Sequence, residues 1–352
     1  MHVDIVEEVR RQAEICNACR YCESYCSVFP AIHSQRSFSD GDLTQYANLC
    51  HNCRACYYAC QYTAPHEFDL NLPAALANLR QESWDAFAWP QGFRARFQRS
   101  GTAIALAAAL AFAFIFAVAQ AIRPADGEGF YAVMSHTVMV SIFLPAFILP
   151  LVSLGVGLAR YWRHVGGTKV RFSELQAAFS SAAAMRNLAS GHGEGCNYED
   201  EDRFSQARRI AHQMVMYGFL LCFASTSIAT VLHYGFSISA PYGLLSLPKL
   251  FGISGGLLLT AGCCWMLYLK FRSDRWLGAV SAWSGEVGFI ALLGFVGVSG
   301  LVLYVLGETA VSPLLLALHL GAVLAFFLLT PFTKMAHGFY RMAALVRDAQ
   351  RP

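Results

Sequence analysis

Charged residues are scarce in this sequence of 352 residues. Lys, Arg, Asp and Glu together make up 14%, whereas about 25% is usual in soluble globular domains. The formal net charge is only +3, so the strongly positive field of a nucleic-acid-binding protein is missing, and we expect no nucleic-acid partner. The opening MHVDIVEEVRRQAEIC carries acids early and has no apolar core, so no secretory signal peptide is predicted.

Two further patterns are missing. Alternating strand patterns are scarce, which favours an all-α protein. No G-x-G-x-x-G fingerprint follows a predicted strand, so we expect no nucleotide or flavin site in this chain. If the protein serves a substrate oxidation, a separate dehydrogenase must supply the electrons.

Long apolar runs are abundant in the rest of the chain. Apolar residues make up 56% of the sequence, and a helix of about 20 apolar residues crosses a bilayer of about 30 Å. Buried helices of a large soluble protein are the alternative, but so many runs would leave little polar surface to cover them. We therefore predict a membrane domain over 96–340 with six spans, at about 101–122, 136–159, 210–232, 250–269, 287–306 and 313–333.

Lys and Arg are concentrated in alternate connections between these runs. They fill the segment before the first span, the long loop 160–209, the connection at 270–275 and the tail 341–352. The positive-inside rule places all four on the cytoplasmic side. We expect a multi-pass protein of the bacterial inner membrane with both termini in the cytoplasm. Loop 160–209 is either a docking surface for the head or a partner, or a solvated linker.

The amino-terminal 60 residues hold eight of the twelve cysteines. They form two quartets with the spacing C-x2-C-x2-C-x3-C, which is the bacterial-ferredoxin spacing for [4Fe–4S] clusters. The fourth cysteine of such a run usually binds the other cluster. This crossed rule assigns one cluster to Cys16, Cys19, Cys22 and Cys60, and the other to Cys50, Cys53, Cys56 and Cys26.

Two alternatives exist for the quartets. Zinc sites with four cysteines use two separated knuckles rather than four cysteines in eleven residues, and structural disulfides are rare in the cytoplasm. One departure from the ferredoxin pattern is that Ser27 and Gln61 replace the proline after each fourth cysteine. Helical periodicity over 3–15, 39–50 and 71–80 favours a helical ferredoxin-like module with two clusters over residues 1–95.

Histidines lie at the ends of two predicted spans. His212 and His233 bound the third span, and His319 and His337 bound the sixth, which crosses in the opposite direction. Depth therefore pairs His212 with His337 on the cytoplasmic side and His233 with His319 on the outer side. Such pairs predict one or two b-type haems with two axial histidines each. Each histidine alone is equally compatible with an interfacial or hydrogen-bonded role, and His136 competes for the outer site.

Three strings identify a family resemblance. EICNACRYCESYC, NLCHNCRACYYACQYTAPHEF and LASGHGEGCNYEDEDRFSQARRIAHQMVMYGFLLCFASTS together resemble the tricarballylate utilisation protein B (CitB-type) family, over nearly the whole chain. The string PFTKMAH, which ends at His337, is also similar to the haem-binding end of the nitrate reductase gamma subunit. The resemblance implies that the eight cysteines bind iron–sulfur clusters, whereas the four histidines remain an inference from depth.

The family resemblance implies an electron-transfer subunit rather than a stand-alone enzyme. Its implied partner is an FAD-dependent dehydrogenase that oxidises tricarballylate to cis-aconitate, and its implied acceptor is the quinone pool. One alternative is a cluster-only electron carrier whose membrane part is a haem-free anchor. A second alternative is a transporter with an iron–sulfur sensor head, since the fourth and fifth runs are rich in glycine.

Overall fold

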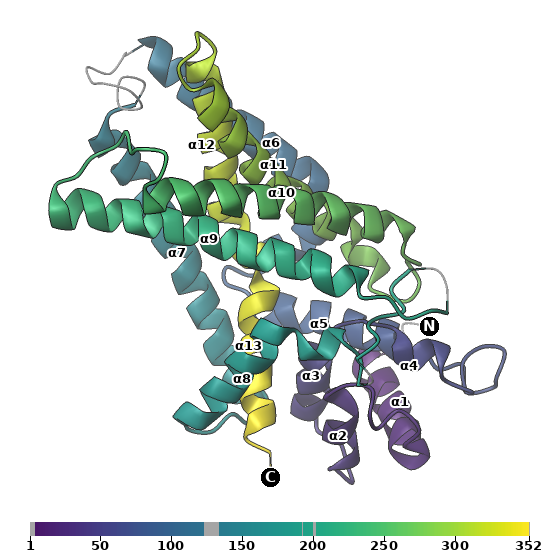
Figure 1. The fold of residues 1–352 in the computed structure, drawn as a ribbon. Coiled ribbons are helices and arrows are strands. Elements are labelled where there is room, and N and C mark those ends of the chain that lie inside the picture. The colour runs from purple at the N-terminus through teal and green to yellow at the C-terminus, as the bar shows by residue number, and fades with distance from the viewer. Residues whose placement is uncertain (1–3, 123–133, 192, 200–201, 352) are drawn as a thin grey trace.

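The structure is a computed structural model that describes residues 4–122, 134–191, 193–199 and 202–351 (Figure 1). Helices and their connections make up these residues, and no β-strand occurs among them. A single isolated bridge joins Cys196 to Ser205. The prediction of an all-α fold is therefore confirmed.

The head, residues 4–92, consists of short helices that begin at the polar residues the sequence offers. The side chain of Asp4 accepts a hydrogen bond at the start of the first helix, and Ser39 and Asp42 form a capping box at the third. Tyr46 and Trp84 are buried in the core of the head. Its helices are α1 (Ile5–Cys19), α2 (Val28–His33), α3 (Asp40–Leu49), α4 (Ala55–Tyr58) and α5 (Leu72–Phe87).

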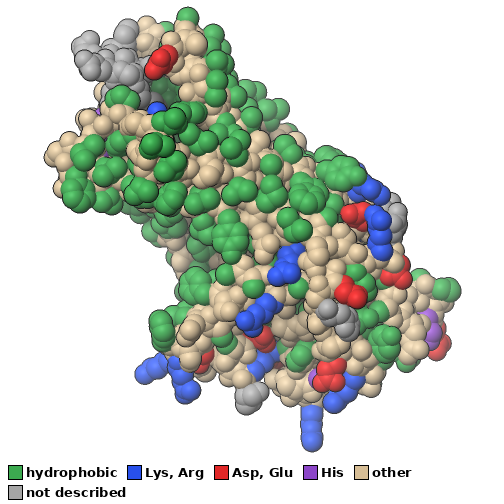
Figure 2. Space-filling model, in the orientation of Figure 1, with side chains coloured by type: hydrophobic (Ala, Val, Ile, Leu, Met, Phe, Trp, Pro, Cys, Tyr) green, Lys and Arg blue, Asp and Glu red, His purple; other side chains and the backbone are tan. Residues whose placement is uncertain are grey.

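Six helices are long and apolar enough to cross a membrane, as the sequence predicted. Several extend beyond the predicted runs at the end nearest the head. Figure 2 shows hydrophobic side chains spread over this part of the molecule, while Lys and Arg gather toward the head. The helices are α6 (Phe93–Ile122), α7 (His136–His164), α9 (Ala207–Phe236), α10 (Leu247–Arg272), α11 (Trp283–Leu306) and α12 (Ser312–Leu329), with η3 (Val280–Ala282) and η4 (Thr330–Phe332) at the ends of α11 and α12.

The six helices form one connected bundle. Helix α12 packs against α6, α11 and α7, α11 also packs against α10, and α9 packs along α10 (Figure 1). The α9–α10 contact depends on small residues, because a Cβ atom on Gly255 would lie 2.8 Å from the backbone nitrogen of Cys222 and 2.9 Å from the carbonyl oxygen of Gly218. Close backbone approach at small residues is typical of helix pairs in membranes.

The head shares one hydrophobic core with the end of α7 and with two helices outside the spans. Helix α13 (Ala336–Ala349) packs against α3 and α7, and α8 (Phe172–Ala184) packs against α13. The side chain of Gln45 donates to the carbonyl of Ala344 (2.7 Å) and accepts from the hydroxyl of Tyr161 (2.6 Å). The predicted tail 341–352 is therefore mostly a packed helix, and its contacts fix the head against the membrane domain.

Candidate functional site

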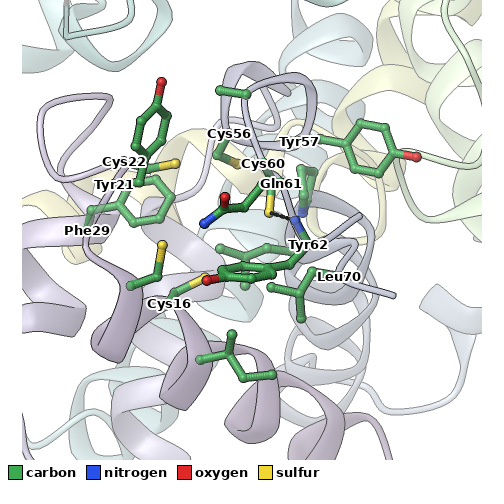
Figure 3. A pocket seen from close by; sticks show the side chains of 15 residues that line it. Cys16, Tyr21, Cys22, Phe29, Cys56, Tyr57, Cys60, Gln61, Tyr62 and Leu70 are labelled. Carbon is green, nitrogen blue, oxygen red and sulfur yellow. Dashed lines mark hydrogen bonds between the residues drawn. The ribbon is translucent and has the colours of Figure 1, made fainter. Parts of the chain in front are cut away.

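The first cysteine site is a cavity of about 230 Å³ in the head (Figure 3). Cys16, Cys19 and Cys22 of the first quartet line it, together with Cys60 of the second quartet. The second site is a smaller cavity whose lining includes Cys26, Cys50, Cys53 and Cys56. Cys56 also borders the first cavity. The two cavities exchange the fourth cysteines as the crossed assignment requires, and the ligand sets themselves stay a prediction.

The two quartets share one backbone feature. Arg20 follows the second cysteine of the first quartet and Arg54 follows that of the second, and both adopt left-handed φ angles, 58° and 70°. At Arg20 this conformation ends α1, and at Arg54 it precedes α4. In both places the chain reverses after two cysteines, so the third cysteine faces the same cavity as the first two.

The thiols lie around the cavities and do not converge on one point. No group of three His, Cys, Asp or Glu residues within the described ranges is placed to hold a single metal ion. A [4Fe–4S] cluster instead needs four thiolates spread around a cube, and at least four cysteines line each of the two cavities. Burial, with Cys22 and Cys60 nearby, raises the pKa of Cys16 to about 12, and a bound cation is what holds such a thiol ionised at neutral pH.

Backbone amides point at the sulfur atoms of both sites. The amide of Asn52 donates to Sγ of Cys50 (3.3 Å), and the amide of Tyr62 donates to Sγ of Cys60 (3.4 Å). Both donors lie two residues after their cysteine. Hydrogen bonds to cluster sulfurs stabilise the reduced, more negative state and help to set the reduction potential.

The segment 187–199 of the long loop covers the second site. The amide of Gly191 donates to the carbonyl of Tyr25 (2.6 Å), and the amide of Asn197 donates to the carbonyl of Cys53 (3.0 Å). The side chain of Asn187 lines the second cavity and pairs with Ser27. This segment therefore contacts the head, and of the two possibilities left open for loop 160–209 the structure favours the docking surface.

Cys196 within this segment is a buried thiol that the sequence analysis left without a role. Its thiol donates to the carbonyl of Leu188 (3.2 Å) and lies next to Cys53. The one sequence signal for the covering segment is the run of small residues LASGHGEGC. Glycine is required at position 191, because a Cβ atom there would lie 1.2 Å from the carbonyl oxygen of Ser24.

The predicted inner histidine pair is in contact. The rings of His212 on α9 and His337 next to the start of α13 lie edge to face with centroids 5.7 Å apart. Nδ1 of His337 contacts the carbonyl of Lys334, and Nδ1 of His212 is buried without a hydrogen-bond partner among the described atoms. Burial, with Arg341 nearby, holds the pKa of His337 well below its ordinary value. The ring is then neutral, as a metal-bound imidazole must be.

The outer histidines are arranged differently from the depth argument. His233 stacks on His136 of α7, with centroids 4.5 Å apart and planes 24° apart. His319 instead hydrogen-bonds Ser299 of α11 (3.0 Å) and lies against Gly300. The predicted pairing of His233 with His319 has no ring contact to support it among the described residues, although α9 and α12 meet elsewhere, at Phe219 and Phe326 (centroids 5.8 Å apart). Depth fixes the level of a side chain in the bilayer but not the direction in which the side chain points.

Comparisons with known proteins follow the same division into head and membrane domain. The family model described as "Citrate utilization protein B Fer4-like domain" matches residues 9–86, and "Citrate utilization protein B" matches residues 96–351. "Citrate utilization protein B" of Escherichia coli is 38% identical over 348 residues, which cover 97% of this chain and 91% of that protein. No solved structure matches the chain. The Fer4-like match indicates an iron–sulfur electron-transfer role, and the chain belongs to the citrate utilisation protein B family.

Proposed function

We propose that this protein is the membrane-bound electron-transfer subunit of a dehydrogenase system. It reoxidises an FAD-dependent dehydrogenase of the tricarballylate dehydrogenase type and delivers the electrons to the quinone pool. Two [4Fe–4S] clusters held by the eight cysteines, and one b-type haem held by His212 and His337, would carry them. One observation carries this proposal. The second cysteine loop, residues 50–56, is in direct contact with the helices that bear His212 and His337, through Arg208 and Arg341.

A reduced flavin releases two electrons, and a quinone takes up two electrons with two protons. Clusters held by the eight cysteines would supply one-electron redox chemistry between the two. The protein supplies the eight thiolates and the amide donors of Asn52 and Tyr62. The segment 187–199 covers the second site and limits the access of water, which would change the potential.

The inner histidine pair would hold one haem. The ring centroids of His212 and His337 lie 5.7 Å apart, and the buried Nδ1 of His212 has no hydrogen-bond partner among the described atoms. A haem held by these two imidazoles would supply a site for one-electron transfer. Metal-bound histidines usually engage a carbonyl through the other ring nitrogen, as His337 does with Lys334. The stacked rings of His136 and His233 do not fit such a site, so we assign one haem.

The orientation of the protein follows from its basic connections. Arg54 donates to the carbonyl of Asp274 (2.7 Å), and Asn52 donates to the carbonyl of Leu277 (2.7 Å). These contacts, with segment 187–199 and α13, bring the Lys- and Arg-rich connections to the head. The positive-inside rule then supports a cytoplasmic head and cytoplasmic termini in the bacterial inner membrane. The flavoprotein would dock on the open side of the first cavity, where Tyr21 is 68% exposed.

A spectrum of the purified protein tests the cofactors. We expect the dithionite-reduced minus oxidised spectrum to show sharp b-type bands, with about one haem per chain by pyridine haemochrome. Electron paramagnetic resonance should show two interacting [4Fe–4S] clusters. Full clusters without haem would contradict the haem and favour the cluster-only carrier. A protein that contains zinc and no iron would contradict the proposal as a whole.

The partner and the acceptor need a second measurement. The reduced flavoprotein should bleach the cluster absorption anaerobically, and a soluble ubiquinone or menaquinone analogue should restore it. The flavoprotein reduced by its own substrate is the donor to use. Clusters that dithionite reduces but the flavoprotein does not would contradict the assigned partner without affecting the cofactor assignment.

A further inference from the structure

We propose that Arg208 and Arg341 are positioning residues that hold the second cysteine loop against the histidine pair. They thereby fix the order of electron transfer through the protein. Electrons enter at the first cysteine site, pass to the second and leave through His212 and His337. This inference rests on the proposed function. It adds the order in which the sites transfer electrons and assigns Arg208 and Arg341 a role in that order.

Helices α9 and α13 each direct one arginine toward the second cysteine loop and one histidine toward the histidine pair. On α9, Arg208 precedes His212 by four residues, and on α13, Arg341 follows His337 by four residues. Residues four apart lie on one face of a helix, about one turn from each other. The two histidines contact each other, and the two arginines contact one loop of the head.

Both arginines donate to the second cysteine loop or to the end of α3 just before it, and Arg208 also lies over the ring of Tyr198, 4.0 Å from its centroid. Arg208 donates through Nη1 to the carbonyl of Asn52 (2.7 Å) and through Nη2 to the carbonyl of His51 (2.9 Å). Arg341 donates through Nη2 to the carbonyl of Cys50 (2.7 Å) and through Nε to that of Asn48 (3.3 Å). A guanidinium group donates to two carbonyls at once through its planar N–H groups, and an ammonium group cannot do so with the same geometry.

Other charges also face this loop. Arg80 on α5 shares the carbonyl of Cys50 with Arg341 (2.7 Å), and Arg54 of the loop itself donates to the carbonyls of Tyr198 and Asp274. These groups add positive charge near the second site, but neither comes from a helix that bears one of the paired histidines. The link from loop to histidines therefore runs through Arg208 and Arg341.

The side chain of His51 also lies on this path. It lines the second cavity next to Cys50, and its Nδ1 hydrogen-bonds the carbonyl of Leu49 (2.8 Å). The backbone carbonyl of His51 accepts from Arg208 of α9 (2.9 Å). His51 therefore joins the lining of the second cavity to the helix that bears His212.

The first site has no comparable link. All residues that line its cavity lie between positions 15 and 73, within the head. The exposed side chain of Tyr21 and the exposed Gln61 border it. The second cavity, in contrast, takes Asn187 of the long loop into its lining. The first site is thus open to a soluble donor and the second is joined to the membrane helices, which sets the order.

Substitution of the arginines in the full-length protein tests the inference. In Arg208→Gln and Arg341→Gln, we expect the midpoint potential of the second cluster to shift downward, because a positive charge near the reduced cluster is lost. The potential of the first cluster should stay unchanged in a redox titration followed by electron paramagnetic resonance. Arg209→Gln is the matched control, since Arg209 is the next residue on α9 but donates to the carbonyl of Ala184.

The lysine variants separate position from charge. Arg208→Lys and Arg341→Lys keep the charge, so we expect the second-cluster potential near that of the parent protein but slower haem reduction in stopped-flow after flavoprotein mixing. Iron analysis identifies any glutamine variant that loses its clusters. If one does, the lysine variants decide whether the arginines position the loop. Equal shifts of both clusters, or an unchanged second cluster with unchanged haem reduction, would overturn the inference. The cluster potentials can be measured without haem. A protein that lacks haem would therefore contradict the proposed function, while the redox titration would still test the roles of Arg208 and Arg341.

Discussion

The ring of His212 meets the ring of His337 edge to face, with centroids 5.7 Å apart, although α9 and α13 come from distant parts of the sequence. One helical turn away on each helix, an arginine binds the loop that carries three cysteines of the second site. A short covalent and hydrogen-bonded connection thus joins that loop to the histidine pair. The connection gives the iron–sulfur head a defined exit toward the membrane helices.

The exchange of fourth cysteines can be tested by matching spectra. We expect Cys60→Ser to perturb the same cluster as Cys16→Ser, and Cys26→Ser the same cluster as Cys53→Ser, because Cys60 lines the first cavity and Cys26 the second. Electron paramagnetic resonance of the four reduced variants makes the comparison. Matching of Cys26→Ser with Cys16→Ser instead would show that each quartet binds its own cluster.

The histidine assignment predicts which substitutions remove haem. His212→Ala and His337→Ala should each abolish the b-type bands, since either loss leaves the metal with one axial ligand. His319→Ala should retain them, because this ring hydrogen-bonds Ser299 and contacts neither member of the inner pair among the described rings. Haem per chain, normalised to iron–sulfur content, is the measurement. Retention of haem in both inner variants would refute the inner site.

The segment that covers the second site is expected to protect its iron. A side chain on Gly191 would overlap the carbonyl of Ser24, so Gly191→Ala must displace the segment. We expect a strong chelator to remove iron faster from this variant, and the second cluster to decay first. Gly193→Asn is the control, because Gly193 has a φ of 78°, open space around it, and asparagine tolerates this conformation. Equal iron loss from both variants would argue against a protective cover.

The close approach of α9 and α10 predicts a difference between two neighbouring glycines. Gly255→Ala would push α10 away from the α9 backbone at Gly218 and Cys222. Gly252→Ala would meet only a side-chain atom, the hydroxyl oxygen of Ser225. Overpacking costs about 1–3 kcal/mol, so we expect the Gly255 variant to unfold at clearly lower temperature in detergent. Similar melting of both variants would mean that the two helices separate without cost.

The topology predicts where reporter fusions function. Green fluorescent protein fused after Pro352 should fluoresce, because the carboxyl terminus is expected in the cytoplasm. Alkaline phosphatase inserted in the connection between α11 and α12, at 307–311, should be active, because that connection is expected in the periplasm. The opposite pattern at both positions would reverse the orientation and place the head outside.

Local sequence was sufficient for most of the secondary structure and for the types of chemistry. Apolar runs of bilayer length predict the six spans because a backbone in lipid must satisfy its own hydrogen bonds in a helix. Capping residues such as Ser39 and Asp42 locate helix starts for the same local reason. The cysteine spacing predicted two cluster sites because short separations along a chain fix how thiols can surround a cavity.

Only the tertiary structure decided which distant residues meet. Depth in the bilayer follows from position along a helix, so the sequence could place His233 and His319 at one level. It could not show that His233 lies beside His136 of α7 and has no ring contact with His319 among the described residues. The covering segment 187–199 and the arginines 208 and 341 likewise act through backbone carbonyls far away in the chain. Every residue has a backbone carbonyl, so the amino-acid type does not indicate which carbonyl will accept these hydrogen bonds. The tertiary packing determines the acceptors.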